Sequence, residues 1–518
     1  MSGFALLPSP ALAQPAEEPP AADAADQPAA QPADAPAADA PPAESPPDAA
    51  EPAVEGDAAA VDSNVVVEGG SLFEDGGAST ADAGDAISAA SAPALPFELN
   101  GYVRGDAFFG KETRGKDAIL RAGYGELALQ FRTQRQEYGD AFAEARFRYG
   151  QQGETQDLIV DLREAYANVY AGPFDLRLGK QIIVWGKADG FNPTNNITPV
   201  DLTVRSPLED DRRVGNFGAR AFLNFAPVRL EGVWMPLYIP TKFPPIPLEP
   251  GVTLLDPVIP GPELENGLGA GRLHLELSSF EMSASYLYGN ALLPGLERYA
   301  YDVGSNASVV VQRRVYTHQV IGFDFSTAFG EELGLRGEAA YRAPINEEAI
   351  YTPNREVNYV VGLDRTFGSL SVIAQYIGKY VLDWEREGTD NPAGLDELRE
   401  IPPADLMTPS IVEDIEAGID EEMRRRNQIL FQQTEELQHT ASVRLEYLAL
   451  HDTLSFSVLG AYNFSTAEWL AFPKISYKFS DALSGSIGGE LYNGPEDTLL
   501  DYLDQDLTAG YVELKYAF

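Results

Sequence analysis

Charged and amide side chains crowd one stretch of the chain, residues 185–213, which follows a run that alternates like a β-strand. Acids and bases are intermixed there, and glycine, proline, asparagine and threonine supply turns and backbone partners. Groups of this kind bind and orient polar solutes through charge and hydrogen bonds. Twelve of them are candidates for a pore constriction: Trp185, Lys187, Asp189, Asn192, Asn195, Asn196, Asp201, Arg205, Asp210, Asp211, Arg212 and Arg213.

Covalent catalysis finds no support in the sequence. The chain has no P-loop, no GxSxG, no HExxH and no cysteine. The four histidines, His274, His318, His439 and His451, are scattered. We therefore predict no catalytic residue, no metal site and no cofactor, and we do not expect an enzyme.

The elements that must position these side chains are strands. From Phe97 onward, apolar and polar residues alternate with period two, as where Leu99 and Val103 oppose Arg104. The runs reach ten or more residues, and short turns alternate with long loops, as in outer-membrane barrels. We predict an all-β fold over residues 95–518, a transmembrane antiparallel β-barrel of about 18 strands, with about 16 as the alternative. Loop 185–213 is expected to fold into the barrel, and loop 385–437 to be partly helical.

The polar face of these strands should border a water-filled lumen, because a barrel of this size is too wide for wall side chains to fill. Inward-facing glutamates would include Glu231, Glu338 and Glu490. Two interpretations stay open: a transverse field that orients solutes, or a solvated wall of cross-strand pairs. The lumen-facing candidates are Arg104, Glu126, Arg146, Arg148, Arg177, Arg220, Arg229, Arg272, Arg336, Arg342, Arg444 and Lys474.

The chain ends in an alternating run, Asp506–Phe518, that should be the closing strand paired with Phe97–Phe109. It finishes on Phe518 with another aromatic, Tyr516, two residues before it. This ending resembles the C-terminal signature by which the barrel assembly machinery of Gram-negative bacteria recognises its substrates. We interpret both aromatics as an assembly signal.

Residues before the barrel differ in composition. Ala11-Leu12-Ala13 resembles a signal-peptidase site, so we interpret residues 1–13 as the remnant of a signal peptide, the alternative being ordinary tail. Residues 14–94 are rich in Ala, Pro and acids, which predicts a disordered tail, periplasmic if the strand number is even. The formal charge of −42 disfavours nucleic acid as a partner.

The segment RLGKQIIVWGKADGFNPTNNITPVDL, residues 177–202, carries a family resemblance that extends sharply to Arg213 and leaves out the tail. It is similar to the "GRQ…WG…NP.D" segment of a porin-like proteobacterial outer-membrane family of unknown function, and more distantly to alginate-export-type porins. The resemblance implies an outer-membrane channel and leaves its substrate open. We expect outer-membrane lipid around the barrel, and a homotrimer stays an open alternative. Our leading hypothesis is a porin for small polar or charged solutes. The alternatives are an exporter of polysaccharide or transporter of hydrophobic compounds, and a structural envelope protein.

Overall fold

The computed structural model describes residues 97–111, 117–152, 155–243, 250–330, 333–386 and 395–518. All of them lie in one unit of the chain, residues 60–518. The predicted signal-peptide remnant and the acidic tail lie outside the described residues.

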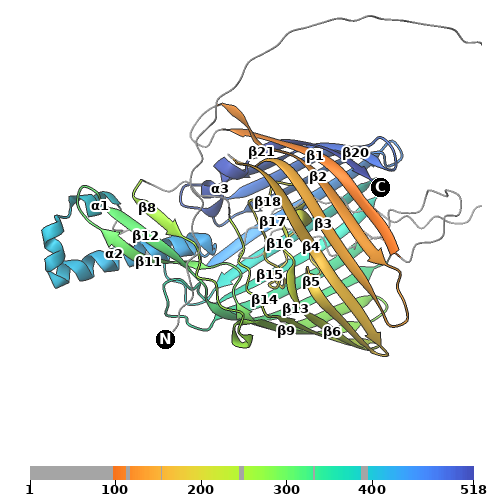
Figure 1. Ribbon diagram of the computed structural model, residues 1–518, viewed down its shortest axis with the longest axis horizontal. Coiled ribbons are helices and arrows are strands. Elements are labelled where there is room, and N and C mark those ends of the chain that lie inside the picture. Colours follow the sequence, from red (N-terminus) through yellow and green to blue (C-terminus); the bar gives the residue numbers. More distant parts are fainter. Residues whose placement is uncertain (1–96, 112–116, 153–154, 244–249, 331–332, 387–394) are drawn as a thin grey trace, which may run out of the picture. The chain divides into compact units, whose positions relative to one another are not determined.

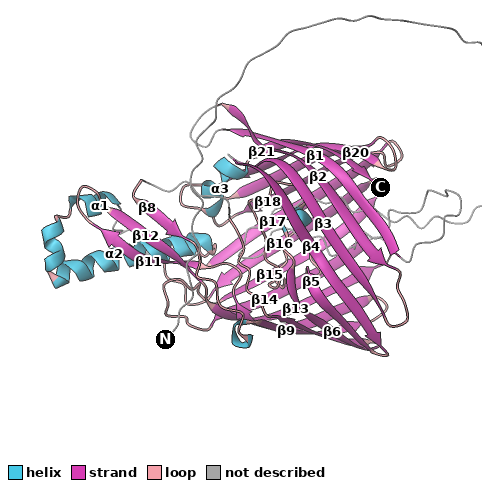
Figure 2. Cartoon of the chain, viewed as in Figure 1, coloured by secondary structure: helices cyan, strands magenta, loops and turns pink. Residues whose placement is uncertain are grey.

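Eighteen strands form one antiparallel sheet in which each strand pairs with the next along the chain, and β1 pairs with β21 to close it (Figures 1 and 2). The predicted barrel and its strand number are therefore confirmed. The strands are β1 Phe97–Lys111, β2 Ala118–Thr133, β3 Gly139–Gln152, β4 Thr155–Ala171, β5 Phe174–Gln181, β6 Asn216–Phe225, β7 Val228–Met235, β9 Leu268–Glu276, β10 Phe280–Asn290, β13 Thr317–Phe329, β14 Leu333–Pro344, β15 Glu356–Phe367, β16 Leu370–Val381, β17 Leu437–Ala449, β18 Leu454–Asn463, β19 Trp469–Lys478, β20 Leu483–Asn493 and β21 Ala509–Ala517.

The two faces of the wall differ as the alternation predicts. On β1, Leu99 and Val103 are 56% and 49% exposed on the outside, whereas Arg104 is only 1% exposed on the inside. On β21, Val512 and Leu514 point outward and Glu513 is buried inside. The barrel therefore presents an apolar exterior and a charged interior, the reverse of a water-soluble sandwich.

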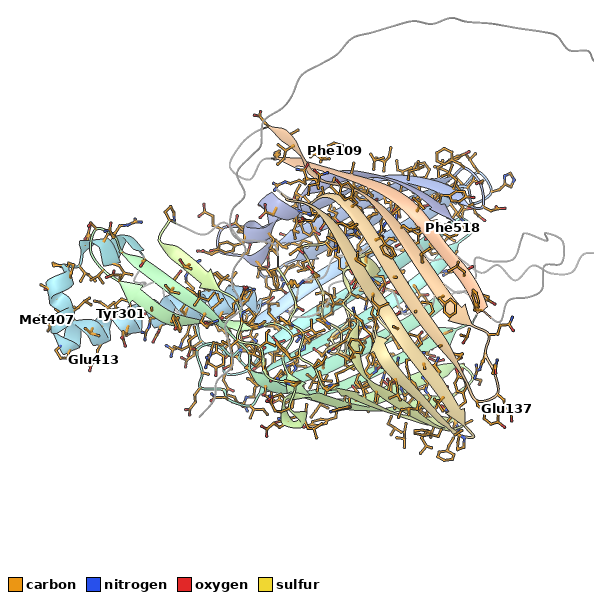
Figure 3. All side chains as sticks on the ribbon, in the orientation of Figure 1. Phe109, Glu137, Tyr301, Met407, Glu413 and Phe518 are labelled. Atoms are coloured by element: carbon orange, nitrogen blue, oxygen red, sulfur yellow. The ribbon has the colours of Figure 1, made fainter. Side chains whose placement is uncertain are left out.

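The seam between β1 and β21 runs from Phe109, opposite Gly510, to Gly101, opposite Phe518 (Figure 3). Gly101 and Phe518 exchange both backbone hydrogen bonds, each 2.9 Å long. The Phe518 ring also covers Gly101, since a Cβ added there would lie 2.9 Å from Phe518 Cζ. The terminal residue is therefore part of the closing pair, which leaves no free sheet edge.

Strand pairing also occurs outside the long alternating runs. The layout of short turns and long loops predicts a long loop at 151–159, which is wrong, because pairing between β3 and β4 continues to Gln152 opposite Thr155. Loops 239–266 and 291–313 contribute a second sheet, in which β12 Ser308–Arg314 lies between antiparallel β11 Gly295–Asp302 and parallel β8 Val252–Leu255. These short apolar runs lack barrel-length alternation, so the sequence alone did not reveal them.

The loop expected to be partly helical holds α1 Leu395–Glu400 and α2 Pro409–Leu430. Proline at the first helical position, Pro409, suits its fixed backbone angle and missing N–H. Within α2, the apolar residues Ile415, Ile419 and Met423 recur every four positions and are buried against the second sheet. We call β8, β11, β12, α1 and α2 the outer cap. Arg298 of β11 binds Asp420 of α2 at 2.8 Å within it.

A helix that the alternation missed, α3 Leu499–Leu507, precedes the last strand. Leu499, Leu503 and Leu507 recur at helical spacing and pack against the inner wall at Leu470 and Phe472. The closing strand consequently begins at Ala509, so the prediction that it began at Asp506 was wrong. Among the described residues, no helix is long and apolar enough to cross a membrane.

Candidate functional site

Residues 182–215, here called the lumen loop, connect β5 to β6 and pack inside the barrel. Ile183, Trp185 and Ile197 are buried against inward side chains that include Val233 and Met235 of β7. The loop base is closed by Thr198, whose hydroxyl donates to the Ile183 carbonyl at 2.6 Å and accepts from the Ile183 N–H at 2.9 Å. Apolar packing thus places the loop in the lumen, and polar contacts fix its position.

The first contact with the wall is the indole of Trp185. Its Nε1–H donates to Glu231 of β7 at 2.9 Å. The same carboxylate binds Arg220 of β6 at 2.7 Å and contacts His274 of β9 at 3.0 Å. Because all four side chains are largely buried, this contact holds the start of the loop against three adjacent strands.

A second contact is made by one carboxylate, Glu338 of β14. It accepts backbone N–H bonds from Lys187 and, at 2.6 Å, from Ala188, and it accepts the Thr194 hydroxyl at 2.9 Å. Charge-assisted bonds of this kind are stronger than neutral ones. Glu338 therefore fixes the backbone of the loop tip.

The third contact is a buried set of charges that we call the charge cluster: Arg104, Glu126, Arg146, Arg148 and Asp211. Asp211 of the loop binds Arg104 at 2.6 Å and Arg146 at 2.5 Å. Glu126 binds Arg104 and Arg148, both at 2.7 Å. Burial alone would raise the pKa of Asp211, but the guanidinium groups of Arg104 and Arg146 hold it well below its ordinary value. Asp211 is therefore a permanent anion at neutral pH.

The end of the loop reaches the opposite side of the seam. Arg212 binds Glu490 of β20 at 2.6 Å, and Arg205 lies 3.4 Å from the same carboxylate. Arg205 also donates to the carbonyl of Leu507 at the end of α3. Together with the charge cluster, these contacts bind the loop to both strands that flank the closing strand and to α3.

Two predicted constriction residues lie where solvent still reaches. Lys187, whose side chain is 37% exposed, binds Glu281 of β10 at 2.6 Å. Asp189 binds Arg336 of β14 at 2.5 Å, and Arg336 also binds Asp364 of β15 at 2.9 Å. Ion pairs of partly exposed charges of both signs thus lie at the loop tip.

Other predicted constriction residues have structural contacts. Asn192 and Asn196 are buried, and their amides bond within the loop, to the Thr194 hydroxyl and the Pro193 carbonyl. The backbone N–H of Asn195 donates to the carbonyl of Asn192 at 3.2 Å, which closes a turn. These amides are engaged within the loop itself, since a loop inside a barrel needs side-chain partners for its own polar groups. That Asn192, Asn195 and Asn196 border the pore stays a prediction.

Asp201, Asp210 and Arg213 lie away from the loop tip. Asp201 binds Lys242, which lies in the connection that follows β7, at 3.0 Å. Asp210 pairs with Arg163 of β4 and, at 3.4 Å, with Arg213. These pairs fasten the loop end and do not add to the charges at its tip.

The predicted lumen-facing residues all project inward, but they divide into two groups. Five arginines contact the lumen loop directly: Arg104, Arg146, Arg272, Arg336 and Arg342, of which Arg272 lies over the Trp185 ring at 5.5 Å from its centroid. Glu126 and Arg220 reach the loop through one partner, and Arg148 through two, Glu126 and Arg104. The remaining side chains lie along the wall. They are Arg177 beside Asn168, Arg229 beside Glu276, and Arg444 and Lys474 on β17 and β19.

Sequence reasoning missed three residues that hold the loop: Arg163, Glu231 and Glu338. Alternation indicated that both glutamates face inward, yet it gives no sign of a partner more than 40 residues away in the chain. Arg163 is the extra residue of β4 at a register shift opposite Glu144 and Ala145 of β3, which period-two counting does not detect. Among the described residues, no group of three acidic or histidine side chains is placed to hold a metal ion.

Residues 25–207 match the model of a family described as a protein of unknown function (DUF1302). The match covers β1 to β5 and most of the lumen loop, which confirms the resemblance to a family of unknown function. It also begins before the barrel, so the inference that the resemblance leaves out the tail was wrong.

Several solved structures are similar over most of the chain. OccK3 (OpdO) of Pseudomonas aeruginosa has a TM-score of 0.46 and 11% identity, covering 82% of this chain and 95% of that one. OccK8 (OprE) of the same organism has a TM-score of 0.48 and 9% identity, covering 82% and 98%. A BenF-like porin from Pseudomonas fluorescens Pf-5 has the same four values as OccK8. No curated protein matches the sequence.

Proposed function

We propose that the protein is an outer-membrane channel through which small polar or charged solutes diffuse, narrowed by the lumen loop. One observation carries the proposal: the closed barrel is apolar outside and charged inside, with a polar loop held across the interior. An apolar exterior requires lipid, and a closed sheet leaves no backbone group unpaired within it. A Gram-negative outer membrane with the N-terminal tail in the periplasm is the location that this architecture favours.

The solute path in this proposal passes the loop tip. Lys187, Glu281, Arg336 and Asp364 are all at least a quarter exposed, in contrast to the buried charge cluster. Opposite charges that face each other across a narrow aqueous passage orient dipolar and charged solutes. The tip therefore sets selectivity, and the buried contacts keep it in place.

A second candidate function is export of polysaccharide or transport of hydrophobic compounds through a barrel that its own loops keep closed. Apolar packing inside the barrel favours it, because the lumen loop and α3 both bury leucine, isoleucine or tryptophan against the wall. Such a barrel would conduct only after the loops move.

Conductance in planar lipid bilayers tests both candidates. Ile183 and Thr198 are hydrogen-bonded neighbours, so residues 184–197 can be replaced by two glycines without disturbing the loop base. We expect steady conductance from the native protein and a larger conductance from the shortened variant. A native protein that is silent, with a conducting variant, would favour the closed exporter. If neither conducts, the channel proposal fails and a structural envelope protein is left.

A further inference from the structure

A cavity lies beside the lumen loop, at the loop-side ends of β10, β13, β14 and β15. The volume that the centre of a water molecule can occupy within this cavity is about 50 Å³. Because such a space is surrounded by a further shell one water radius thick, a single substituted six-membered ring fits. Its apolar lining includes Leu293, Tyr316 and Phe431, and the last two rings meet edge to face at 5.9 Å.

One lining side chain has an unmet hydrogen bond. His318 of β13 is 8% exposed, and its Nε2 is buried without a partner. Buried polar atoms are nearly always paired, so an unpaired one calls for a physical explanation. No packing role requires a histidine here, since a phenylalanine would fill similar space without an unmet polar atom.

A second unmet group belongs to Arg342 of β14, in the same lining. Its two terminal nitrogens donate to Glu356 at 3.4 Å and to the Pro193 carbonyl at 3.2 Å, whereas its Nε–H has no partner. Glu356 also lines the cavity, so the two lining charges cancel. Arg342 and His318 thus each bring one buried nitrogen without a partner to a wall that mixes apolar and polar side chains and whose charges cancel.

We propose that this cavity binds a neutral ring bearing one hydroxyl group, of the phenol class. A hydroxyl accepts and donates at once, so it can accept from Arg342 Nε–H and also bond His318 Nε2 in either tautomer. The ring would pack against Tyr316, Phe431 and Leu293. A carboxylate has no proton to donate and would add an uncompensated charge beside Glu356.

This inference rests on the proposed channel function, for which it names a class of solute. The site lies between the lumen loop, through Asn196, and Phe431, which follows α2. A ring captured there would be held at the loop-side mouth before passing the loop tip. Binding itself, however, requires no conductance and can be measured separately.

Fluorine NMR of the refolded full chain in detergent tests the site, with 4-fluorophenol as the probe. Fluorobenzene lacks the hydroxyl and 4-fluorobenzoate carries a charge, so both are matched comparisons. We expect saturable shifts for 4-fluorophenol and affinities weaker by about tenfold for the other two, the difference made by one hydrogen bond. Equal affinity of fluorobenzene, tighter binding of 4-fluorobenzoate, or no saturable binding of 4-fluorophenol would each overturn the proposal.

Variants locate the site. His318→Phe should weaken 4-fluorophenol binding by about tenfold. His439→Phe, on an outward side chain bonded to Tyr376, is the matched control and should leave binding unchanged. Leu293→Phe fills the cavity from a loop and should also abolish binding, which keeps the test decisive if His318→Phe fails to fold. Unchanged binding in a folded His318 or Leu293 variant would refute the assignment. A protein that conducts but does not bind 4-fluorophenol would refute only this inference. A protein that binds 4-fluorophenol but does not conduct would refute only the proposed channel function.

Discussion

Replacing Asp211 by asparagine should release the lumen loop. The substitution removes the anion that binds Arg104 at 2.6 Å and Arg146 at 2.5 Å, and the side chains of both arginines are at most a tenth exposed. Removing one partner of a buried ion pair costs about 3–5 kcal/mol. Arg104 keeps Glu126, and asparagine keeps some hydrogen bonding, so we expect about 3 kcal/mol. That energy corresponds to a shift of about 150-fold from the bound to the released loop.

Single-channel recording measures this shift directly. Asp211→Asn should show frequent fluctuations to a larger conductance and a lower temperature of heat-induced unfolding in detergent. Asp201→Asn is the matched control, because it removes an acid from the same loop whose partner, Lys242, is 62% exposed. Exposed pairs contribute about 0–1 kcal/mol, so this variant should behave as wild type. Identical noise and unfolding temperature in the two variants would refute the view that buried charges hold the loop.

Mild acid should not release the loop. The pKa of Asp211 is depressed in the folded protein, so its side chain stays charged until the pH falls through that depressed pKa. Conductance should therefore be constant from about pH 7 to about pH 4 and rise only below that. Deleting Phe518 should reduce assembly into outer membranes, measured by fractionation, because two closing hydrogen bonds are lost, while the conductance of refolded barrels stays unchanged. Gly378→Ala should destabilise the barrel by about 1–3 kcal/mol in urea titrations, since Tyr359 lies 2.1 Å from the new Cβ, whereas Gly105→Ala, with nothing within 4 Å, should be neutral.

The barrel wall was predictable because each strand can be recognised from the alternation of its own residues. Leu99, Val103 and Arg104 alternate within one segment, so period two reveals both the strand and its faces without knowledge of any neighbour. The closing pair of β1 and β21 followed from the need to remove free edges. Here local pattern and overall topology agree.

What occupies the lumen was less predictable, because long-range contacts decide it. Glu338 holds the backbone of Ala188 from 150 residues away, and Glu490 holds Arg212 from 278 residues away. Neither contact can be recognised from the residues around it in the sequence. The leucines of α3 do show helical spacing, but they adjoin an alternating strand and the nine-residue helix is short. An amide such as that of Asn192 suits both a channel lining and a buried turn, so the residue type alone does not decide between them.

In the proposed channel the loop tip borders the solute path, and one cysteine can test this position. Because the chain has no native cysteine, Lys187→Cys provides a single reactive thiol at a side chain that is 37% exposed. A charged methanethiosulfonate reagent added during bilayer recording should then change the conductance in discrete steps. Complete labelling, verified by mass spectrometry, with no change in conductance would contradict the account.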